Sequence, residues 1–281
     1  MKKENDQICT YNHKLLSIFD GVTWKICEQC QLIYASQKKG LAYKINEQEH
    51  FDCFPEGNRH EFNSCINKFQ KYIKKNTNQL TFFDFGCGAG GELIQAQKRF
   101  KKVSGFEPNK KLYDLCLSKF FNLINNFDEI FEIENVDVCF AKNPFRYVDN
   151  FLYTFQAFID LIKPDGFLVW RDKYFNWIPR PNLGFGEVKV NPSQTENYLM
   201  EDTIIFHLER LGMKIHYKKF YFNDTFFIVA QKGPYKKKFK NKKVNRMIVF
   251  NEKIIGIIHI LRKKLNYLRE TLQKKIYFIR I

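Results

Sequence analysis

The chain has 281 residues, of which 44% are hydrophobic and 17% aromatic, so it can form a sizeable core and is not a disordered chain. Its formal net charge is +16, which taken alone suggests a nucleic-acid or acidic-membrane partner. However, residues 232–281 carry +14 and residues 1–231 only +2, so the basic character belongs to the C-terminal segment.

The N-terminus has no apolar segment of the kind found in signal peptides, and no window approaches 18 uncharged apolar residues. We therefore expect a cytoplasmic chain, with the basic tail as the part that could hold it at the inner face of the membrane. In that compartment the eight cysteines are expected to be reduced core thiols or metal ligands rather than disulfides.

Composition divides the chain into four parts. Residues 1–45 contain short strand-like pieces and three cysteines, and residues 46–79 connect them to the rest through a predicted helix at 62–75. Residues 80–232 alternate strands with helices, and residues 233–281 form the basic tail.

The N-terminal part contains two cysteines at metal-ligand spacing, Cys27 and Cys30. Two thiolates in a C-x2-C turn can chelate one tetrahedral ion, and a second pair of ligands completes a closed zinc site. Cys9 and His13 lie upstream, so we expect a structural zinc at Cys9, His13, Cys27 and Cys30. Two alternatives stay open: another fourth ligand, or reduced core cysteines without a metal. The other candidate fourth ligands are Cys53, His50 and His60.

In the central part, apolar strands are separated by helices, which predicts right-handed crossovers and a mostly parallel sheet. The final pair of strands flanks a turn signal and is expected to form an antiparallel hairpin. The expected strands are 80–85, 103–107, 136–141, 167–170, 214–221 and 226–231, and the expected helices are 92–100, 110–121, 147–162 and 201–211.

The strongest functional pattern is the glycine cluster after the first of these strands. Gly86, Gly88 and Gly90 stand between a strand and a helix, where glycines let the backbone approach a ligand closely. Glu107 ends the next strand, where an acid can accept hydrogen bonds from both ribose hydroxyls. Asp84 precedes the glycines, and a carboxylate there disfavours a pyrophosphate and favours a cofactor with a cationic amine. The pattern therefore predicts a nucleotide-like cofactor other than a dinucleotide.

These motifs resemble those of the class I S-adenosylmethionine-dependent methyltransferases. Residues 83–90 (FDFGCGAG) match the first motif of that superfamily, residues 105–108 (GFEP) the second, and residues 161–169 (LIKPDGFLV) its turn and fifth strand. The resemblance covers about residues 62–231 and implies a Rossmann-like α/β fold. Its seven-stranded sheet would have a reversed last strand and helices on both faces.

The resemblance also implies that S-adenosylmethionine is the cofactor. It places Asp84 near the amine of the cofactor, Gly86, Gly88 and Gly90 along its methionine part, and Glu107 at its ribose. An adenine-side residue is expected between Asn125 and Asp128. Further cofactor-binding candidates are Cys87, Pro108 and Asn143.

Residues 27–34 (CEQCQLIY) resemble the C-x-x-C-G-L-V-Y knuckle that precedes many bacterial methyltransferase domains, including those of sugar and polysaccharide pathways. This implies a zinc-ribbon-like module and a small-molecule or glycan-linked acceptor. Many small-molecule members have a Glu-His pair where this chain has Arg146-Tyr147. A general base is therefore not identified by the resemblance. The weak candidates are Tyr147, Asp149, His50 and His60.

Residues 143–145 (NPF) resemble the Asn-Pro-Pro-aromatic motif of amino-methyltransferases with one proline missing, and we favour reading them as a loop that enters a helix. Trp170 and Arg171 follow the fifth strand, where they could shape an acceptor pocket or simply pack. Cys65, Cys116 and Cys139 are expected to be core thiols.

In the tail, apolar residues from Ile254 to Leu272 step by three and four, which predicts a basic amphipathic helix. Three roles for residues 234–281 stay open: docking on an anionic membrane or a protein partner, packing on the chain's own domain, and binding nucleic acid. Two alternatives to the small-molecule methyltransferase follow. One is an RNA or protein methyltransferase that docks through the tail, and the other is a non-catalytic pseudo-enzyme that binds the cofactor.

Overall fold

The computed structural model describes residues 13–19, 22–30, 32–38, 59–118, 122–133, 135–145, 148, 150–174, 197–221 and 225–233. The chain divides into two compact units, Met1–Lys240 and Asn241–Ile281, and all the described residues belong to the first. The amphipathic helix expected in the tail therefore lies outside the described residues.

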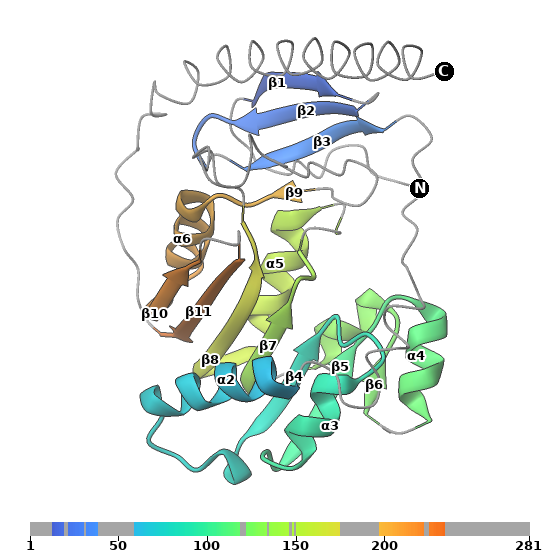
Figure 1. Ribbon diagram of the computed structural model, residues 1–281, viewed down its shortest axis with the longest axis vertical. Helices are drawn as coiled ribbons and strands as arrows, with labels where there is room; N and C mark the ends of the chain where they lie inside the picture. The colour runs from blue at the N-terminus through green and yellow to red at the C-terminus, as the bar shows by residue number, and fades with distance from the viewer. Residues whose placement is uncertain are drawn as a thin grey trace, which may run out of the picture. The chain divides into compact units, whose positions relative to one another are not determined.

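Within the described part of the chain, seven strands form one mixed, mostly parallel sheet (Figure 1). Their order across the sheet is β10-β11-β8-β7-β4-β5-β6, and β11 is the single strand that runs against its neighbours β8 and β10. This confirms the predicted seven-stranded α/β sheet with its reversed last strand. The bounds are β4 (Thr81–Phe85), β5 (Lys102–Phe106), β6 (Leu123–Ile124), β7 (Val136–Lys142), β8 (Ile162–Lys173), β10 (Met213–Phe220) and β11 (Thr225–Lys232).

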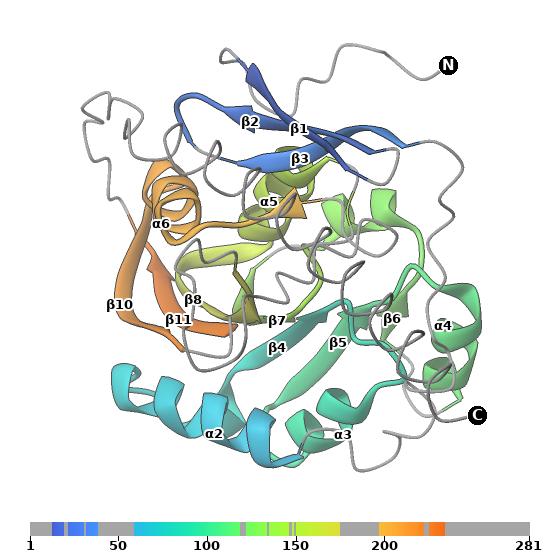
Figure 2. The same ribbon diagram turned by 45° about the horizontal axis from the view of Figure 1, so that its top comes forward.

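Helices lie on both faces of this sheet, as predicted (Figure 2). One face packs against α2 and α3. The aromatic core between these helices and the sheet includes Phe62, Phe82 and Phe140, with ring centroids 5.5–5.9 Å apart. The other face packs against α5 and α6. Apolar residues at helical spacing drive both layers by burial of apolar area. The helices are α2 (Arg59–Phe69), α3 (Gly91–Gln97), α4 (Lys110–Leu117), α5 (Phe151–Asp160) and α6 (Glu201–Arg210).

Two elements differ from the prediction. Helix α5 begins at Phe151 rather than at residue 147, because the Asn150 side chain accepts a hydrogen bond from the Tyr153 N–H (3.1 Å) and caps the helix there. The segment 163–166, predicted as a turn before the strand, lies inside β8. Asp165 adopts a left-handed φ of 62° in that segment, and the β7–β8 register shifts between Val136 and Val138. The strand therefore passes through an irregularity instead of starting after it.

A second sheet has the order β1-β2-β3-β9 and combines the first described strands with a short strand that lies between β8 and α6 in the chain. Strands β1 (His13–Phe19), β2 (Val22–Cys27) and β3 (Ile33–Lys38) form an antiparallel meander, and β9 (Asn197–Tyr198) pairs with β3. The sequence did not predict β9. Its Asn197 is fully buried, and the side-chain amide donates to the carbonyl oxygens of Phe145 (3.2 Å) and Val148 (2.6 Å). This side chain ties the second sheet to the loop after β7.

Candidate cofactor site

The glycine loop after β4 has the backbone conformation that its sequence spacing suggested. Gly86, Gly88 and Gly90 have φ angles of 80°, 56° and 85°, so every second residue is left-handed. Only glycine adopts this region without a steric penalty, which explains the alternation G-x-G-x-G. The N–H groups of Gly86 and Cys87 donate to the Phe106 carbonyl at 2.9 and 3.0 Å, and this holds the loop beside the end of β5.

Close packing adds a second reason for glycine at two positions. A Cβ on Gly86 would lie 3.2 Å from the Pro144 Cβ, which belongs to the loop after β7. A Cβ on Gly105 would lie 3.2 Å from both the Asp84 carbonyl oxygen and the Cys87 Sγ. The ends of β4, β5 and β7 therefore approach one another at the carboxyl edge of the sheet, where ligands bind in open α/β folds.

Glu107 reaches from the end of β5 into the glycine loop. Its Oε2 accepts a hydrogen bond from the Gly88 N–H at 2.7 Å and its Oε1 accepts from the Asn109 N–H at 2.8 Å. Burial raises the pKa of this carboxyl, and the two backbone donors oppose the rise. Each carboxylate oxygen keeps a further lone pair, so Glu107 can accept two additional hydrogen bonds from a diol.

Asp84 is almost fully buried at the end of β4. Burial is the main reason that its pKa lies well above the ordinary value, and the nearby Glu92 carboxylate raises it further, whereas Lys142 lowers it. A cation placed beside a buried carboxyl stabilises its ionised form. The position therefore suits the ammonium group of an amino acid.

The remaining predicted cofactor residues surround this loop. The Cys87 thiol is buried, and a hydrogen bond to Cys116 together with burial raises its pKa. Pro108 is exposed, and its carbonyl accepts from the Asn125 side-chain amide (3.3 Å), which also donates to the Glu107 carbonyl at 3.0 Å. Asn143 adopts a left-handed φ of 59°, and its N–H donates to the Arg171 carbonyl at 3.0 Å.

Sequence reasoning missed an ionic network beside the loop. Lys142, the last residue of β7, lies 2.6 Å from a carboxylate oxygen of Glu92 and 3.4 Å from one of Glu61. Glu61, in the first turn of α2, also forms an ion pair with Arg171 of β8. Lys142 and Arg171 are directly opposite each other in the β7–β8 ladder. These residues come from four elements, so no local pattern joins them.

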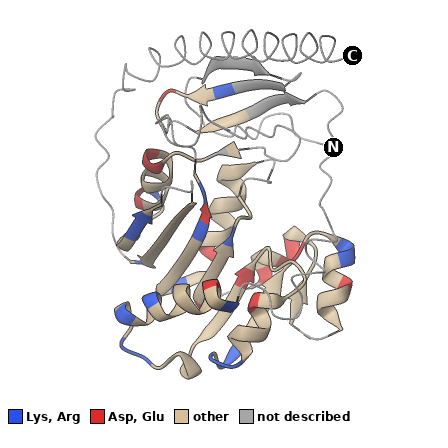
Figure 3. Ribbon diagram, viewed as in Figure 1, with Lys and Arg blue, Asp and Glu red and all other residues tan. Residues whose placement is uncertain are grey.

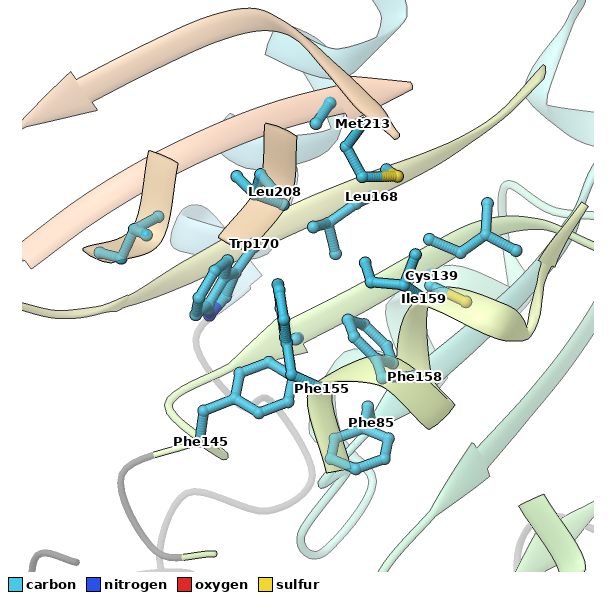
Figure 4. Close-up of a cluster of buried hydrophobic side chains, with 14 of the residues drawn as sticks. Phe85, Cys139, Phe145, Phe155, Phe158, Ile159, Leu168, Trp170, Leu208 and Met213 are labelled. Atoms are coloured by element: carbon cyan, nitrogen blue, oxygen red, sulfur yellow. The ribbon is translucent and has the colours of Figure 1, made fainter. Parts of the chain in front are cut away.

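The loop after β7 is anchored by its aromatic residue. Phe145 is fully buried and stacks on Phe85 with centroids 5.5 Å apart, and its ring lies 5.1 Å from that of Trp170 (Figure 4). Both aromatic side chains are core residues. This geometry favours the structural reading of residues 143–145 over stacking on an acceptor base, and it assigns Trp170 to packing.

Of the four candidates for a general base, one lies among the described residues. His60 is exposed near the start of α2, while His50, Tyr147 and Asp149 lie outside the described residues. The buried carboxylate of Asp172, at the carboxyl end of β8, was not expected from the sequence; it accepts from the Lys173 N–H at 2.7 Å. Cys65, Cys116 and Cys139 are buried as predicted, and burial is the main cause that raises the pKa of Cys65 to about 12.

Of the predicted metal ligands, Cys27 and Cys30 are both buried, and the Cys30 N–H donates to the Cys27 Sγ at 3.5 Å. His13 is the residue directly opposite Cys27 in the β1–β2 ladder. Cys9 lies outside the described residues. Among the side chains that the structure describes, no group of three or more His, Cys, Asp or Glu is arranged to hold a metal ion. The zinc site is therefore not shown.

Comparison with known proteins supports the fold. The structure is similar to an S-adenosylmethionine-dependent methyltransferase from Aquifex aeolicus, with a TM-score of 0.50 and 16% identity over 67% of this chain and 100% of that one. It is also similar to a chain from the complex of the Haloferax volcanii Trm112 methyltransferase activator with a methyltransferase. That match has a TM-score of 0.50 and 12% identity over 67% of this chain and 96% of the other.

At these identities the likeness establishes the methyltransferase fold. No protein-family model matches the sequence, and no curated protein is detectably similar to it. None of the described helices has both the length and the apolar character needed to span a membrane.

Proposed function

We propose that the protein is an S-adenosylmethionine-dependent methyltransferase whose acceptor is a small or glycan-linked molecule. The observation that carries the proposal is the contact of Glu107 with the glycine loop. It combines a carboxylate able to accept from a ribose diol with a loop whose backbone is open to close approach. Asp84 adds a buried carboxyl suited to an ammonium group.

S-adenosylmethionine supplies an electrophilic methyl group bound to a sulfonium sulfur. When the methyl group is transferred, the rest of the cofactor is the leaving group, a neutral thioether. The residues of the chain then have to orient the donor, exclude water and present the acceptor in line, and positioning of this kind accounts for much of the rate. Glu107 and the glycine loop would hold the donor at the edge formed by β4, β5 and β7. A hydroxyl or amine acceptor also needs a base, and His60, Tyr147, Asp149 and His50 stay candidates for it.

Calorimetry with S-adenosylmethionine tests the cofactor assignment. We expect wild-type protein to bind and Glu107→Ala to bind at least about tenfold more weakly, because hydrogen bonds to a charged group contribute roughly 1.5–3 kcal/mol. Asp160→Ala is the matched control, since Asp160 is an exposed acid at the C-terminal end of α5, which precedes β8 and so lies at the opposite edge of the sheet. Equal affinities for the two variants would remove Glu107 from the cofactor site.

Two further measurements, of methyl transfer and of RNA binding, separate this proposal from its alternatives. Cofactor binding without methyl transfer to any acceptor would favour the pseudo-enzyme. Binding of RNA with a steep salt dependence, lost on deleting residues 234–281, would favour an RNA methyltransferase that docks through the tail.

We further propose a structural zinc at Cys9, His13, Cys27 and Cys30. The proposal is supported by the amide-to-sulfur hydrogen bond within the Cys27–Cys30 turn and by the ladder position of His13. Metal analysis of the purified chain should find about one zinc per chain, and Cys27→Ser should lose it. Well under one equivalent of metal, together with wild-type stability of Cys27→Ser, would contradict this proposal.

A further inference from the structure

A groove lies between α2 and β10. Its volume is about 610 Å³, within the range of small-molecule sites, and it is open to solvent. Its lining includes Lys68 of α2, Lys71 of the 3-10 helix that follows α2 (Gln70–Tyr72), Lys219 of β10 and Arg171 near the carboxyl end of β8. Figure 3 shows that Lys and Arg occur on both α2 and β10. We refer to this feature as the α2–β10 groove.

The groove is basic and contains no acidic lining residue among those described. Arg171 is neutralised by Glu61. In the part of the chain that the structure describes, Lys68, Lys71 and Lys219 have no such ion pair. Like charges along one cleft repel one another and focus a positive potential into it, so an anion in the groove is favoured.

Aromatic rings hold two of these lysines in the groove. The Lys68 Nζ lies 4.3 Å from the centroid of the Tyr217 ring, and the Lys219 Nζ lies 4.8 Å from that of Tyr221. Tyr217 and Lys219 are alternate residues of β10 and so share one face of the sheet. Lys68, in the last turn of α2, and Lys71, in the 3-10 helix that continues from it, are three positions apart and so lie near each other on the helical surface. The cations are therefore gathered from two sides rather than scattered.

From these observations we infer that the α2–β10 groove binds a small molecule that carries a diphosphate group. The three lysines form no ion pair among the described residues, and they come from two separate segments of the chain that line the same groove. A diphosphate carries two linked anionic groups, so it can meet cations from both segments. A volume of about 610 Å³ suits a single small ligand, and a nucleic-acid interface would be expected to cover a far larger surface. Lysine ammonium groups bind phosphates as point charges.

The groove connects to the cofactor site through Arg171. Glu61 joins Arg171 to Lys142, and Lys142 joins Glu61 to Glu92 in the first turn of α3. A ligand anchored by its diphosphate in the groove would extend along this network toward the carboxyl edge of β7. The inference rests on the proposed function and names the acceptor as the diphosphate-bearing molecule.

The first test is lysine acetylation of the full chain with and without inorganic pyrophosphate, read residue by residue by peptide mass spectrometry. We expect pyrophosphate to protect Lys68, Lys71 and Lys219. The exposed lysines Lys74 and Lys75 should stay reactive. Uniform protection, or protection confined to the basic residues after position 231, would overturn the inference.

The second test compares two triple variants that remove the same charge, K68Q/K71Q/K219Q in the groove and K74Q/K75Q/K98Q outside it. The groove variant should bind pyrophosphate at least about tenfold more weakly than the control variant, a factor equivalent to about 1.4 kcal/mol. Equal affinities would overturn the inference. If the groove variant does not fold, the acetylation pattern of the wild type decides the question.

Two further measurements separate failure of this inference from failure of the proposed function. S-adenosylmethionine should bind both triple variants like wild type, so failure of wild-type cofactor binding would contradict the proposed function and not the groove. A ten-nucleotide RNA is the competing probe. If this RNA protects the three groove lysines at concentrations where pyrophosphate does not, the groove is a nucleic-acid surface and the inference fails.

Discussion

At the scale of single residues, the glycine loop after β4 depends on backbone conformations that are unfavourable for residues other than glycine. Gly86 combines a φ of 80° with a close approach to Pro144. A Cβ added at this position would therefore meet both an unfavourable backbone conformation and a close contact. Gly233 has neither, since a Cβ there would meet nothing within 4 Å. The two positions form a natural pair for comparison.

We expect Gly86→Ala to lower the free energy of unfolding by about 1–2 kcal/mol, the usual penalty of a left-handed residue with a Cβ. Urea unfolding measures the change. Gly233→Ala should stay within about 0.5 kcal/mol of wild type, as surface substitutions usually do. If both variants lose the same stability, the loop conformation is not the cause.

Substitution of Asp84 by asparagine should have opposite effects on the stability of the protein and on cofactor binding. Its raised pKa indicates that burial penalises the ionised carboxylate. Asp84→Asn removes that penalty, so the ligand-free protein should gain about 1 kcal/mol, in the range common when a functional site is relieved. The same change should weaken S-adenosylmethionine binding. Thermal unfolding and calorimetry measure the two effects.

The sign of the pH dependence follows from the same shift. Because the pKa of Asp84 is raised, its carboxylate forms only as pH increases, and wild-type affinity for the cationic cofactor should increase with pH over that range. Asp84→Asn should lose this dependence. The control is Asp114→Asn, an exposed acid paired with Lys110 at 2.7 Å, which should change neither property.

At the scale of elements, β4 and β7 are joined at their amino ends by Asp137. Its Oδ2 accepts from both the N–H and the hydroxyl of Thr81 at 2.9 Å, and Lys163 forms an ion pair with it. Burial alone would raise the pKa of Asp137, but the hydrogen bonds from Lys163 and Thr81 outweigh burial and lower it. The ionised form is therefore the one that stabilises the fold.

A carboxyl with a depressed pKa in the folded state contributes stability above its unfolded pKa and loses it as pH falls through the folded pKa. We expect Asp137→Asn to reduce the free energy of unfolding by about 1–2 kcal/mol at pH 7. The difference from wild type should narrow as pH falls below the ordinary aspartate pKa of about 3.9, because the unfolded chain takes up its proton there before the folded chain does. A difference that stays constant as pH falls well below that value would rule out the ionised carboxylate as its source.

Prediction from sequence succeeded for elements with a clear apolar pattern and failed for those too short to have one. Strands β4, β5 and β7 are short, largely apolar segments beside turn or helix signals, and α6 has a clear apolar stripe, so each was located within one or two residues. Strands β6 and β9 have two residues each, too few for any period. Helix α5 begins four residues after its predicted start because the Asn150 side chain caps it there.

At the scale of the whole molecule, the net charge and the residues proposed to bind the cofactor occupy different parts of the sequence. Residues 232–281 hold nearly all of the net charge, while the glycine loop, Asp84 and Glu107 lie in the nearly neutral body. We expect deletion of residues 234–281 to leave S-adenosylmethionine affinity unchanged. It should abolish sedimentation with phosphatidylserine vesicles, since each basic residue near such a surface contributes about 1 kcal/mol. Retained vesicle binding would exclude the tail as the membrane contact.

The sequence by itself determined the class of fold and the conformation of the glycine loop. Both depend on local features, the apolar period of each element and the left-handed glycines between β4 and α3, which are contiguous in the chain. Only the tertiary structure decided the surroundings of that loop. Glu61, Glu92, Lys142 and Arg171 meet at one edge from four elements, and the α2–β10 groove forms from segments about 150 residues apart. Long-range charge pairs leave no periodic trace in a sequence, because their spacing is set by sheet order and not by the geometry of one helix or strand.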